Sequence, residues 1–575
     1  MGQAGQTVRV AAVQFAVSED TAANLATALR MIDKAAADGA ELIVLPEFSN
    51  HCAWFRDTGH AFEQAETLEG DFVAAIAGRA QQHGAWIVVN STVRRRNNAV
   101  TGTNILIGPD GKVAATADKQ VLMGNENTYL ERASTAGPIT ATPLGRIGLF
   151  SCMDGVMSET PRGLALRGAQ ILCNTLNSFA NDEASLHIPV RAAENKVFVV
   201  AANKVGPLVP PAMVNVVAGK LHIAPERLNG AGESQIVAPD GTVLAIAPRD
   251  GEAVVIADIE VALADSKTRP DGTDIFAARR PELYAPMAEE PRPRQKPPGA
   301  AELAVAVIQP GQDFDVPATA AAVAQAAHKG AALIVLPELF HIPGGRVTDS
   351  AAAVAASDFA INALRSALLG TASVVATSVV ARGADGQMRH IGALIGGSGV
   401  VRMQPQLHKV ARHGWVTALG DGIHPVDLPW GRLALIVGDD ALYPETFRLA
   451  ALQDCDAVAL PFQVAEAWEV CTGLIERAAE NRLSVIAATR PNAAGTSLII
   501  APDRDFTLWT PWTRPFNGDI NKPVVTRASA AAGTTAAIVH PVTAANREVT
   551  LKTNVVESRP WNLLDAIVKP VRPPV

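Results

Sequence analysis

Residues 40–48 read AELIVLPEF and residues 331–340 read AALIVLPELF, so one strand-like run with a terminal LPE occurs twice. Apolar runs also precede both, VRVAAVQF at 8–15 and LAVAVIQP at 303–310. A third string, RAAEN, is repeated at 191–195 and at 477–481. The copies lie about 290 residues apart, which is too long for a solenoid repeat and typical of duplicated whole domains.

The segment between the copies is rich in proline and charge, reading PMAEEPRPRQKPPG at 286–299. Such a composition is typical of a semi-extended linker. We therefore predict two domains, 1–285 and 301–575, joined by a proline-rich linker over 286–300. The chain of 575 residues is 48% hydrophobic, which provides enough material for more than one buried core.

Strand and helix patterns alternate within each copy. The stretch 21–37 places Leu25, Leu29 and Ile32 on one helical face. Asp20 precedes this stretch and is a suitable N-cap. The continuous branched run before LPE is typical of a strand buried on both faces. Further strand-like runs are IGLFS at 147–151, AQILCNT at 169–175 and KVFVVAAN at 196–203. This alternation predicts an α/β fold whose sheets are covered by helices.

The composition argues against several classes of function. A net charge of −8 and an aromatic share of 5% argue against a nucleic-acid binder, which needs a basic surface and stacking side chains. The sequence contains no run of about 18 uncharged apolar residues, so no membrane span is predicted. The first residues also lack a signal-peptide pattern. The five cysteines match neither a disulfide framework nor a paired CxxC site, which indicates a reducing cytoplasm. Cys173, Cys455 and Cys471 are expected in the core.

Three residues of the first copy could carry chemistry. Glu47 ends a buried strand at LPE, Lys119 lies in ADKQVLMGNENTYL, and Cys152 follows the strand-like IGLFS. A thiol at a strand-to-helix turn gains from the helix N-terminus, which favours the thiolate. Since a free thiol has a pKa of about 8.5, a base or a cation must assist. Glu47 is a candidate base, and Lys119 a candidate oxyanion donor.

These residues and their surrounding motifs resemble the nitrilase, or carbon–nitrogen hydrolase, superfamily. The motifs, in chain order, are LPEF, Lys119, SCMDGVMSE, RAAENKVFVVAANKVG at 191–206 and GESQIVAPDG at 232–241. The resemblance implies a four-layer α-β-β-α sandwich and a triad of Glu47, Lys119 and Cys152. It also implies a further glutamate close after the lysine, for which Glu126 is the best match. Each of the first four motifs is weak alone, but together and in the same order they make the resemblance specific.

The resemblance further implies a mechanism. Glu47 deprotonates Cys152, whose thiolate attacks an amide-type carbonyl, while Lys119 and the N–H of Met153 stabilise the oxyanion. Ammonia or an amine leaves, and water activated by Glu47 hydrolyses the thioester. The run Cys152-Met153-Asp154 is similar to the pattern of amidases and carbamoylases rather than of true nitrilases. No cofactor is implied, and the lack of HExxH or paired CxxC motifs predicts no metal.

Substrate contacts are expected on loops after the strands. His51 and Trp54 follow Glu47, and Asn177 and Phe179 follow another strand; all four could equally be packing residues. The partner would be a small-molecule amide. Nitrile hydrolysis or acyl transfer by the same thiol remains open, and so does a non-catalytic scaffold or binding protein.

The second copy looks like a degenerate domain. Glu338 and Lys409 repeat the glutamate–lysine spacing, and an ion pair between them is expected. Gly438 stands at the nucleophile position, counted back from RAAEN, and Val416 stands at the distance of Glu126. Since glycine has no nucleophile, the second domain should be inactive. Because the family associates through helical faces, the two copies could pack as an intramolecular pseudo-dimer, with further homo-oligomers possible; domains that tumble independently in solution scattering would contradict this.

Overall fold

The computed structural model describes residues 7–311 and 315–570 and divides them into two compact units. The first unit comprises the described residues up to Lys267 together with Asp505–Ile520 and those from Glu548 onward. The second unit comprises the described residues from Thr268 to Arg504 together with Asn521–Arg547. Two late segments of the chain therefore belong to the first unit.

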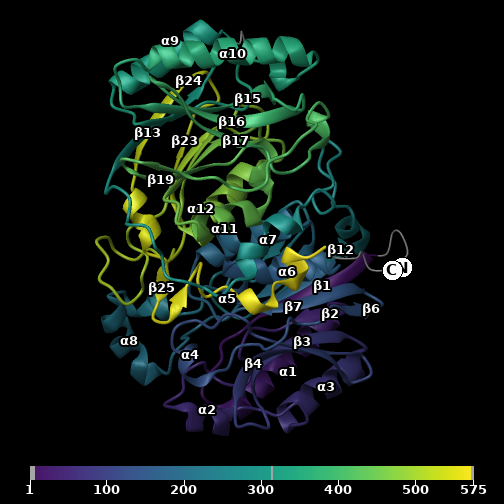
Figure 1. The fold of residues 1–575 in the computed structure, drawn as a ribbon. Coiled ribbons are helices and arrows are strands. Elements are labelled where there is room, and N and C mark those ends of the chain that lie inside the picture. Colours follow the sequence, from purple (N-terminus) through teal and green to yellow (C-terminus); the bar gives the residue numbers. More distant parts are fainter. Residues whose placement is uncertain (1–6, 312–314, 571–575) are drawn as a thin grey trace. The chain divides into compact units, whose positions relative to one another are not determined.

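The first unit contains two six-stranded sheets (Figure 1). One has the order β12-β1-β2-β3-β4-β5, formed by Ala253–Glu260, Thr7–Gln14, Leu42–Val44, Trp86–Arg94, Val100–Ile107 and Val113–Asp118. The other has the order β11-β10-β9-β8-β7-β6, formed by Val243–Ile246, Gln235–Val237, Phe198–Ala202, Ile171–Thr175, Gly145–Ser151 and Thr140–Thr142. The central strands β1-β2-β3 and β7-β8-β9 run parallel.

The sheets of the first unit pack face to face through one apolar core, to which both contribute. Helices α1 (Thr21–Ala37) and α3 (Asp71–His83) cover the outer face of the first sheet through a second core. Helices α6 (Glu159–Leu166) and α7 (Ile188–Asn195) pack on the second sheet. This is the expected α-β-β-α sandwich.

The predicted local elements of the first copy are confirmed. Helix α1 covers the stretch 21–37, and the Asp20 side chain accepts hydrogen bonds from the N–H groups of Ala22 and Ala23 at 3.0 Å. The branched run before LPE forms β2, which is fully buried because it lies between β1 and β3 in the sheet and between two apolar cores.

The second unit repeats this architecture. Its sheets have the orders β17-β16-β15-β14-β13-β24 and β18-β19-β20-β21-β22-β23. In these orders the strands are Gly399–Pro405, Met388–Gly396, Val374–Arg382, Leu333–Val335, Leu303–Gln309 and Gly533–Val539, then Val426–Leu428, Gly431–Leu435, Ala457–Pro461, Ser484–Ala488, Leu498–Ala501 and Val524–Arg527. Its longer helices are α9 (Val316–His328), α10 (Ser350–Ala367), α11 (Pro444–Leu452) and α12 (Leu474–Asn481). The duplication is thus a duplication of the whole sandwich.

All five cysteines are free. Cys173 and Cys455 are buried, as expected, but Cys471 is exposed, so the expectation that it belongs to the core is wrong. Among the described residues, no helix has both the length and the apolar character that a membrane crossing requires.

Candidate active site

The residues singled out in the first copy follow strand ends. Glu47 lies three positions after β2, Lys119 directly after β5 and Cys152 directly after β7. The N–H of Glu47 donates to the carbonyl of Leu176, which follows β8, so the ends of the two sheets meet here. In α/β folds, ligands bind beyond the carboxyl ends of parallel strands.

Glu47, Lys119 and Glu126 form one buried ionic cluster. Lys119 Nζ lies 2.8 Å from Glu47 Oε1 and 2.9 Å from Glu126 Oε2, and the lysine and Glu47 side chains have no exposed surface. The second carboxylate oxygen of Glu47 has no hydrogen-bond partner among the described residues. Glu126 also accepts a hydrogen bond from the N–H of Met123 at 2.8 Å. The structure therefore brings together three of the four expected catalytic side chains and leaves one oxygen of the base unoccupied.

The charges of this cluster tune its proton affinities. Burial raises the pKa of Glu47 to about 7, although the Lys119 ammonium lowers it. Burial also opposes the charge on Lys119, but the Glu126 and Glu47 carboxylates outweigh it and raise the lysine pKa well above its ordinary value. Lys119 is therefore a permanent cation, while Glu47 can exchange a proton near neutral pH.

Cys152 lies in a strained and firmly held turn. Its φ of 45° and ψ of −108° are costly for a residue with a Cβ atom. Its N–H donates to the carbonyl of Thr175 at 2.9 Å and to Asn174 Oδ1 at 3.1 Å. Strained conformations of this kind persist where the surroundings enforce them, and they concentrate at functional sites.

The surroundings of Cys152 disfavour its thiolate form. Burial, together with the Glu47 carboxylate, raises the pKa of the Cys152 thiol well above its ordinary value. The following helix α5 (Met153–Val156) has only four residues, so its dipole is small. The thiol therefore needs a base to accept its proton, and the charge of Glu47 acts on it directly.

Asp154 joins the nucleophile turn to the lysine segment. Its carboxylate accepts hydrogen bonds from the N–H groups of Gln120 at 3.1 Å and Val121 at 2.7 Å, and from the N–H of Ser151 at 3.2 Å. These hydrogen bonds fix the positions of Lys119 and Cys152, which neighbour the bonded residues, relative to each other. This explains physically why an aspartate follows Cys152 by two positions.

The expected substrate contacts divide into two groups. Met153 is buried and begins α5, so its N–H has no acceptor within that helix. His51 is buried, and its Nδ1 lies 2.7 Å from the carbonyl oxygen of Cys52. Asn177 Oδ1 is buried without a hydrogen-bond partner among the described residues. Met153 and Asn177 therefore keep polar atoms for a ligand, whereas His51 is occupied by its own loop.

Trp54 and Phe179 belong to an apolar cluster of the first unit. The cluster includes Leu508 and Trp512 from the segment Asp505–Ile520, and Phe179 also makes an edge contact with Phe516 at 6.1 Å between ring centres. This segment comes from the second half of the sequence but belongs to the first unit. Both aromatic side chains therefore pack in this cluster.

Sequence reasoning missed two residues of this region. Lys204 follows β9 and is 2% exposed. The sequence does contain a signal for Lys204, which is the second lysine of the run RAAENKVFVVAANKVG, but the motif itself assigns this lysine no role. Thr553, in strand β26 (Thr553–Asn554), holds the loop that carries Glu126: its Oγ1 accepts from the N–H of Gly124 at 2.8 Å and donates to the carbonyl of Leu122 at 3.0 Å. No sequence signal connects residues more than 400 positions apart.

The second unit places a glutamine, not a lysine, at the position of Lys119. The N–H of Lys119 donates to the carbonyl of Gly102, and the N–H of Gln406 donates to the carbonyl of His390 at the matching point of β16. Lys409 is exposed. The expected ion pair between Glu338 and Lys409 is therefore wrong, because the spacing from the glutamate does not preserve the strand register.

Glu338 is instead held by Arg412 and His413. Arg412 donates to both carboxylate oxygens at 2.6 and 2.8 Å, and His413 Nε2 lies 2.9 Å from Oε1. Burial opposes the charge on Glu338, but Arg412 and His413 outweigh it and hold the pKa of Glu338 well below its usual range. Arg412 also donates to Asp439 at 2.8 Å. This carboxylate is a permanent anion and not a base.

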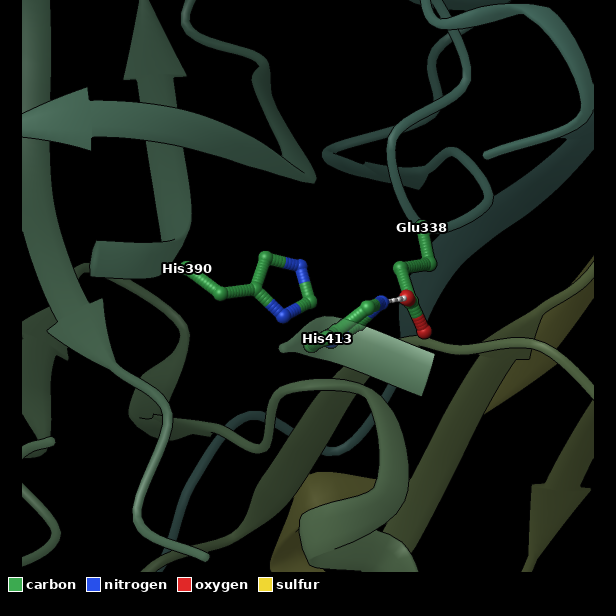
Figure 2. Close-up of side chains that lie close together, drawn as sticks. All are labelled: Glu338, His390 and His413. Atoms are coloured by element: carbon green, nitrogen blue, oxygen red, sulfur yellow. Dashed lines mark ion pairs between the residues drawn. The ribbon is translucent and has the colours of Figure 1, made fainter. Parts of the chain in front are cut away.

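Glu338, His390 and His413 are also the residue types that hold divalent cations, and their ligand atoms all lie within 4.8 Å of one another (Figure 2). However, both oxygens of Glu338 accept hydrogen bonds from Arg412, and the two ring nitrogens of His390 lie 2.6 and 2.7 Å from Gln406 Oε1 and Ser378 Oγ. A cation would have to displace a guanidinium, so these residues do not fit a resident metal.

Gly438 occupies the nucleophile position with a φ of 56°. A Cβ atom there would lie 2.9 Å from Glu338 Oε2 and 3.4 Å from His390 Cε1. The space of a nucleophile side chain is thus taken by the carboxylate and the imidazole, and glycine also relieves the backbone strain.

Comparisons with known proteins agree with this architecture. A sequence model of the carbon–nitrogen hydrolase family matches residues 9–268 and 304–514. A nitrilase of Pyrococcus abyssi is 29% identical over 263 residues, which are 45% of this chain and 92% of that protein. An N-carbamoylputrescine amidase of Solanum lycopersicum is 27% identical over 299 residues, 49% of this chain and 96% of that protein.

Similar solved structures include an amidase variant from Nesterenkonia sp. AN1 with a covalent adduct on its active-site cysteine. It is 23% identical, has a TM-score of 0.40, and the match covers 48% of this chain and 95% of that one. The NitFhit protein of C. elegans is 22% identical with a TM-score of 0.42, over 49% of this chain and 67% of that one.

Proposed function

Since the chain belongs to the carbon–nitrogen hydrolase family, we propose that its first unit hydrolyses a linear, amide-type substrate through a thioester on Cys152. The observation that carries the proposal is the buried cluster in which Glu47 and Glu126 share the Lys119 ammonium. The charges of this cluster act directly on the thiol of Cys152. Ammonia or an amine is the first product, and a carboxylic acid is the second.

In the first half-reaction the Cys152 proton passes to Glu47 as sulfur bonds to the carbonyl carbon. The carbonyl oxygen takes the electron pair of its π bond, and the Lys119 ammonium and the Met153 N–H stabilise that charge. When the oxyanion collapses, the C–N bond breaks and Glu47 returns the proton to the leaving nitrogen. Glu126 positions Lys119 throughout.

In the second half-reaction a water molecule gives a proton to Glu47 and attacks the thioester carbon. The C–S bond breaks, the acid is released, and the proton on Glu47 restores the thiol. The raised pKa of Glu47 suits this role, because a group that both accepts and returns a proton works best when its pKa lies near the ambient pH.

The rival chemistries use the same thiol. Amide hydrolysis is favoured over nitrile hydrolysis and acyl transfer by the Cys152-Met153-Asp154 run, which is similar to the pattern of amidases. A scaffold role is opposed by the strained nucleophile turn and by the proton-exchanging Glu47, which a binding protein does not need. The second unit, with Gly438 and Gln406 in place of the nucleophile and the lysine, is proposed to be inactive.

The test is ammonia release by the full-length protein from matched amides, carbamoyl compounds and nitriles, together with intact-protein mass spectrometry after rapid acid quenching. We expect amide turnover and an acyl adduct that peptide mapping places on Cys152. Turnover of nitriles alone would replace the proposal with nitrilase activity. An absence of both turnover and adduct across the panel would favour the scaffold.

A further inference from the structure

A second buried lysine lies at the candidate site. Lys204 follows β9 in the sheet where Cys152 follows β7, and both of these strands run parallel to β8. The lysine is 2% exposed and Cys152 is 9% exposed. Because parallel strands end at the same edge of a sheet, their following residues face the same ligand region.

The Lys204 ammonium has no ionic or hydrogen-bonding partner among the described residues. The backbone N–H of Lys204 donates to Asn203 Oδ1 and its carbonyl accepts from Gly232, but Nζ makes only a cation–π contact, 5.8 Å from the centre of the Phe48 ring. Lys119 Nζ lies 5.5 Å from the same ring centre, but its charge is neutralised by two carboxylates. The two lysines thus approach one ring, and only Lys204 retains an uncompensated charge.

Burying an unpaired ammonium is costly, so its retention needs an explanation. Burial lowers the pKa of Lys204 to about 8, while the Glu47 carboxylate raises it, so the group is still mostly protonated at neutral pH. Glu47, the proposed base, is therefore one of its electrostatic neighbours. An anion that enters with the substrate would supply the missing partner.

We propose that Lys204 Nζ binds a carboxylate of the substrate, so that the enzyme selects amides that carry an anionic group over neutral amides. This inference rests on the proposed amide hydrolysis at Cys152. Lys119 cannot take the same role, because Glu47 and Glu126 already occupy its ammonium. Lys119 thus donates to the oxygen of the substrate amide, and Lys204 donates to the carboxylate of the substrate.

The experiment uses the full-length protein and substrate pairs that differ in one charge, such as succinamate and its methyl ester. We expect the wild type to favour the free acid in kcat/KM. Lys204→Met, which keeps the length and removes the charge, should lower the acid-to-ester ratio by about 10–100-fold, the range of a charge-assisted hydrogen bond. Lys204→Arg should restore part of the ratio. Lys220→Met, on the exposed face of α8 (Val214–Leu221), is the matched control and should leave the ratio unchanged.

Two results would overturn the inference. One is a wild type that turns over acid and ester equally well. The other is a Lys204→Met protein that loses activity on both by the same factor, which would make the lysine a general stabiliser of the reacting charges. Thermal unfolding of each variant shows whether a loss of activity arises from misfolding. If Lys204→Met misfolds, the acid-to-ester ratio of Lys204→Arg decides the test. A wild type that hydrolyses no amide and forms no adduct contradicts the proposed function itself.

Discussion

Arg412 donates to both carboxylate oxygens of Glu338, at 2.6 and 2.8 Å, and so fixes this glutamate as an anion. In the first unit the corresponding Glu47 faces only the single nitrogen of Lys119, and its second oxygen has no partner among the described residues. The same residue in the same fold is therefore free to act as the proposed proton acceptor in one unit and is a counter-ion in the other. Five predictions follow from this difference and from the contacts around it.

Replacement of the nucleophile should abolish turnover. Cys152→Ala removes the sulfur atom that we propose forms the thioester, so both ammonia release and the acyl adduct should disappear. Cys471→Ala, an exposed cysteine, is the control and should retain wild-type activity. Residual amide turnover above about one part in 10³ in Cys152→Ala would assign the reaction to another group.

The pH dependence should report Glu47. Because the base must be unprotonated to accept the thiol proton, kcat/KM should rise with pH and level off above about 7, the pKa to which burial raises Glu47. Glu47→Gln should lower kcat/KM by about 10²–10⁴ and remove this limb. Glu69→Gln, an exposed glutamate, serves as the control. An unchanged limb in Glu47→Gln would assign it to a different group.

Thr553 should act on catalysis through the Glu126 loop. Its Oγ1 contacts Leu122, Gly124 and, at 3.4 Å, Asn127 Nδ2. Thr553→Val keeps the shape but loses these hydrogen bonds, so kcat/KM should fall by about 10-fold as Glu126 moves. Thr553→Ser should recover most of the loss. A double-mutant cycle with Glu126→Gln should show strong non-additivity; additive effects would mean that the threonine only stabilises the fold.

A cysteine should not revive the second unit. In Cys152→Ala/Gly438→Cys the new Cβ atom would lie 2.9 Å from Glu338 Oε2, at a φ of 56° that favours glycine. Glu338 is held by Arg412, and Gln406 supplies no cation. The double variant should be inactive in ammonia release and less stable by about 1–3 kcal/mol in denaturant unfolding. Recovered turnover would show that the second site is a latent catalyst.

Arg412 should stabilise the second unit in a pH-dependent way. Arg412→Met removes the cation that Glu338 and Asp439 share, leaving His413 beside Glu338 and Arg269 beside Asp439. The loss should cost about 2–3 kcal/mol, less than a fully buried pair because the guanidinium is 25% exposed. Since the folded pKa of Glu338 is lowered, this stabilisation is complete above about 4.3, the unfolded pKa, and is lost as the pH falls toward the folded value.

The measurement is urea unfolding at pH 7 and at pH 3.5. We expect the difference between Arg412→Met and wild type to be smaller at the lower pH. The control is Arg389→Met, which removes an exposed ion pair with Asp385 and should cost less than about 1 kcal/mol at pH 7. Equal losses from the two substitutions would mean that Arg412 is not a buried counter-ion.

The sequence by itself determined the features that are encoded locally. The repeated LPE and RAAEN strings established the duplication, the helix over 21–37 began at Asp20, and the short motifs indicated Glu47, Lys119, Cys152 and the loss of a nucleophile at Gly438. Such features can be predicted from the sequence alone because strand periodicity, capping and turn chemistry depend on neighbouring residues.

Only the tertiary structure decided which side chains meet. Counting from Glu338 selected Lys409, whereas strand pairing places Gln406 at the lysine position and brings Arg412 onto the glutamate. Lys204 reaches the site through a sheet edge and Thr553 through a late segment, and burial raises the pKa of the Cys152 thiol. Register, burial and long-range contact depend on how distant segments pack, so they become visible only when the chain is folded.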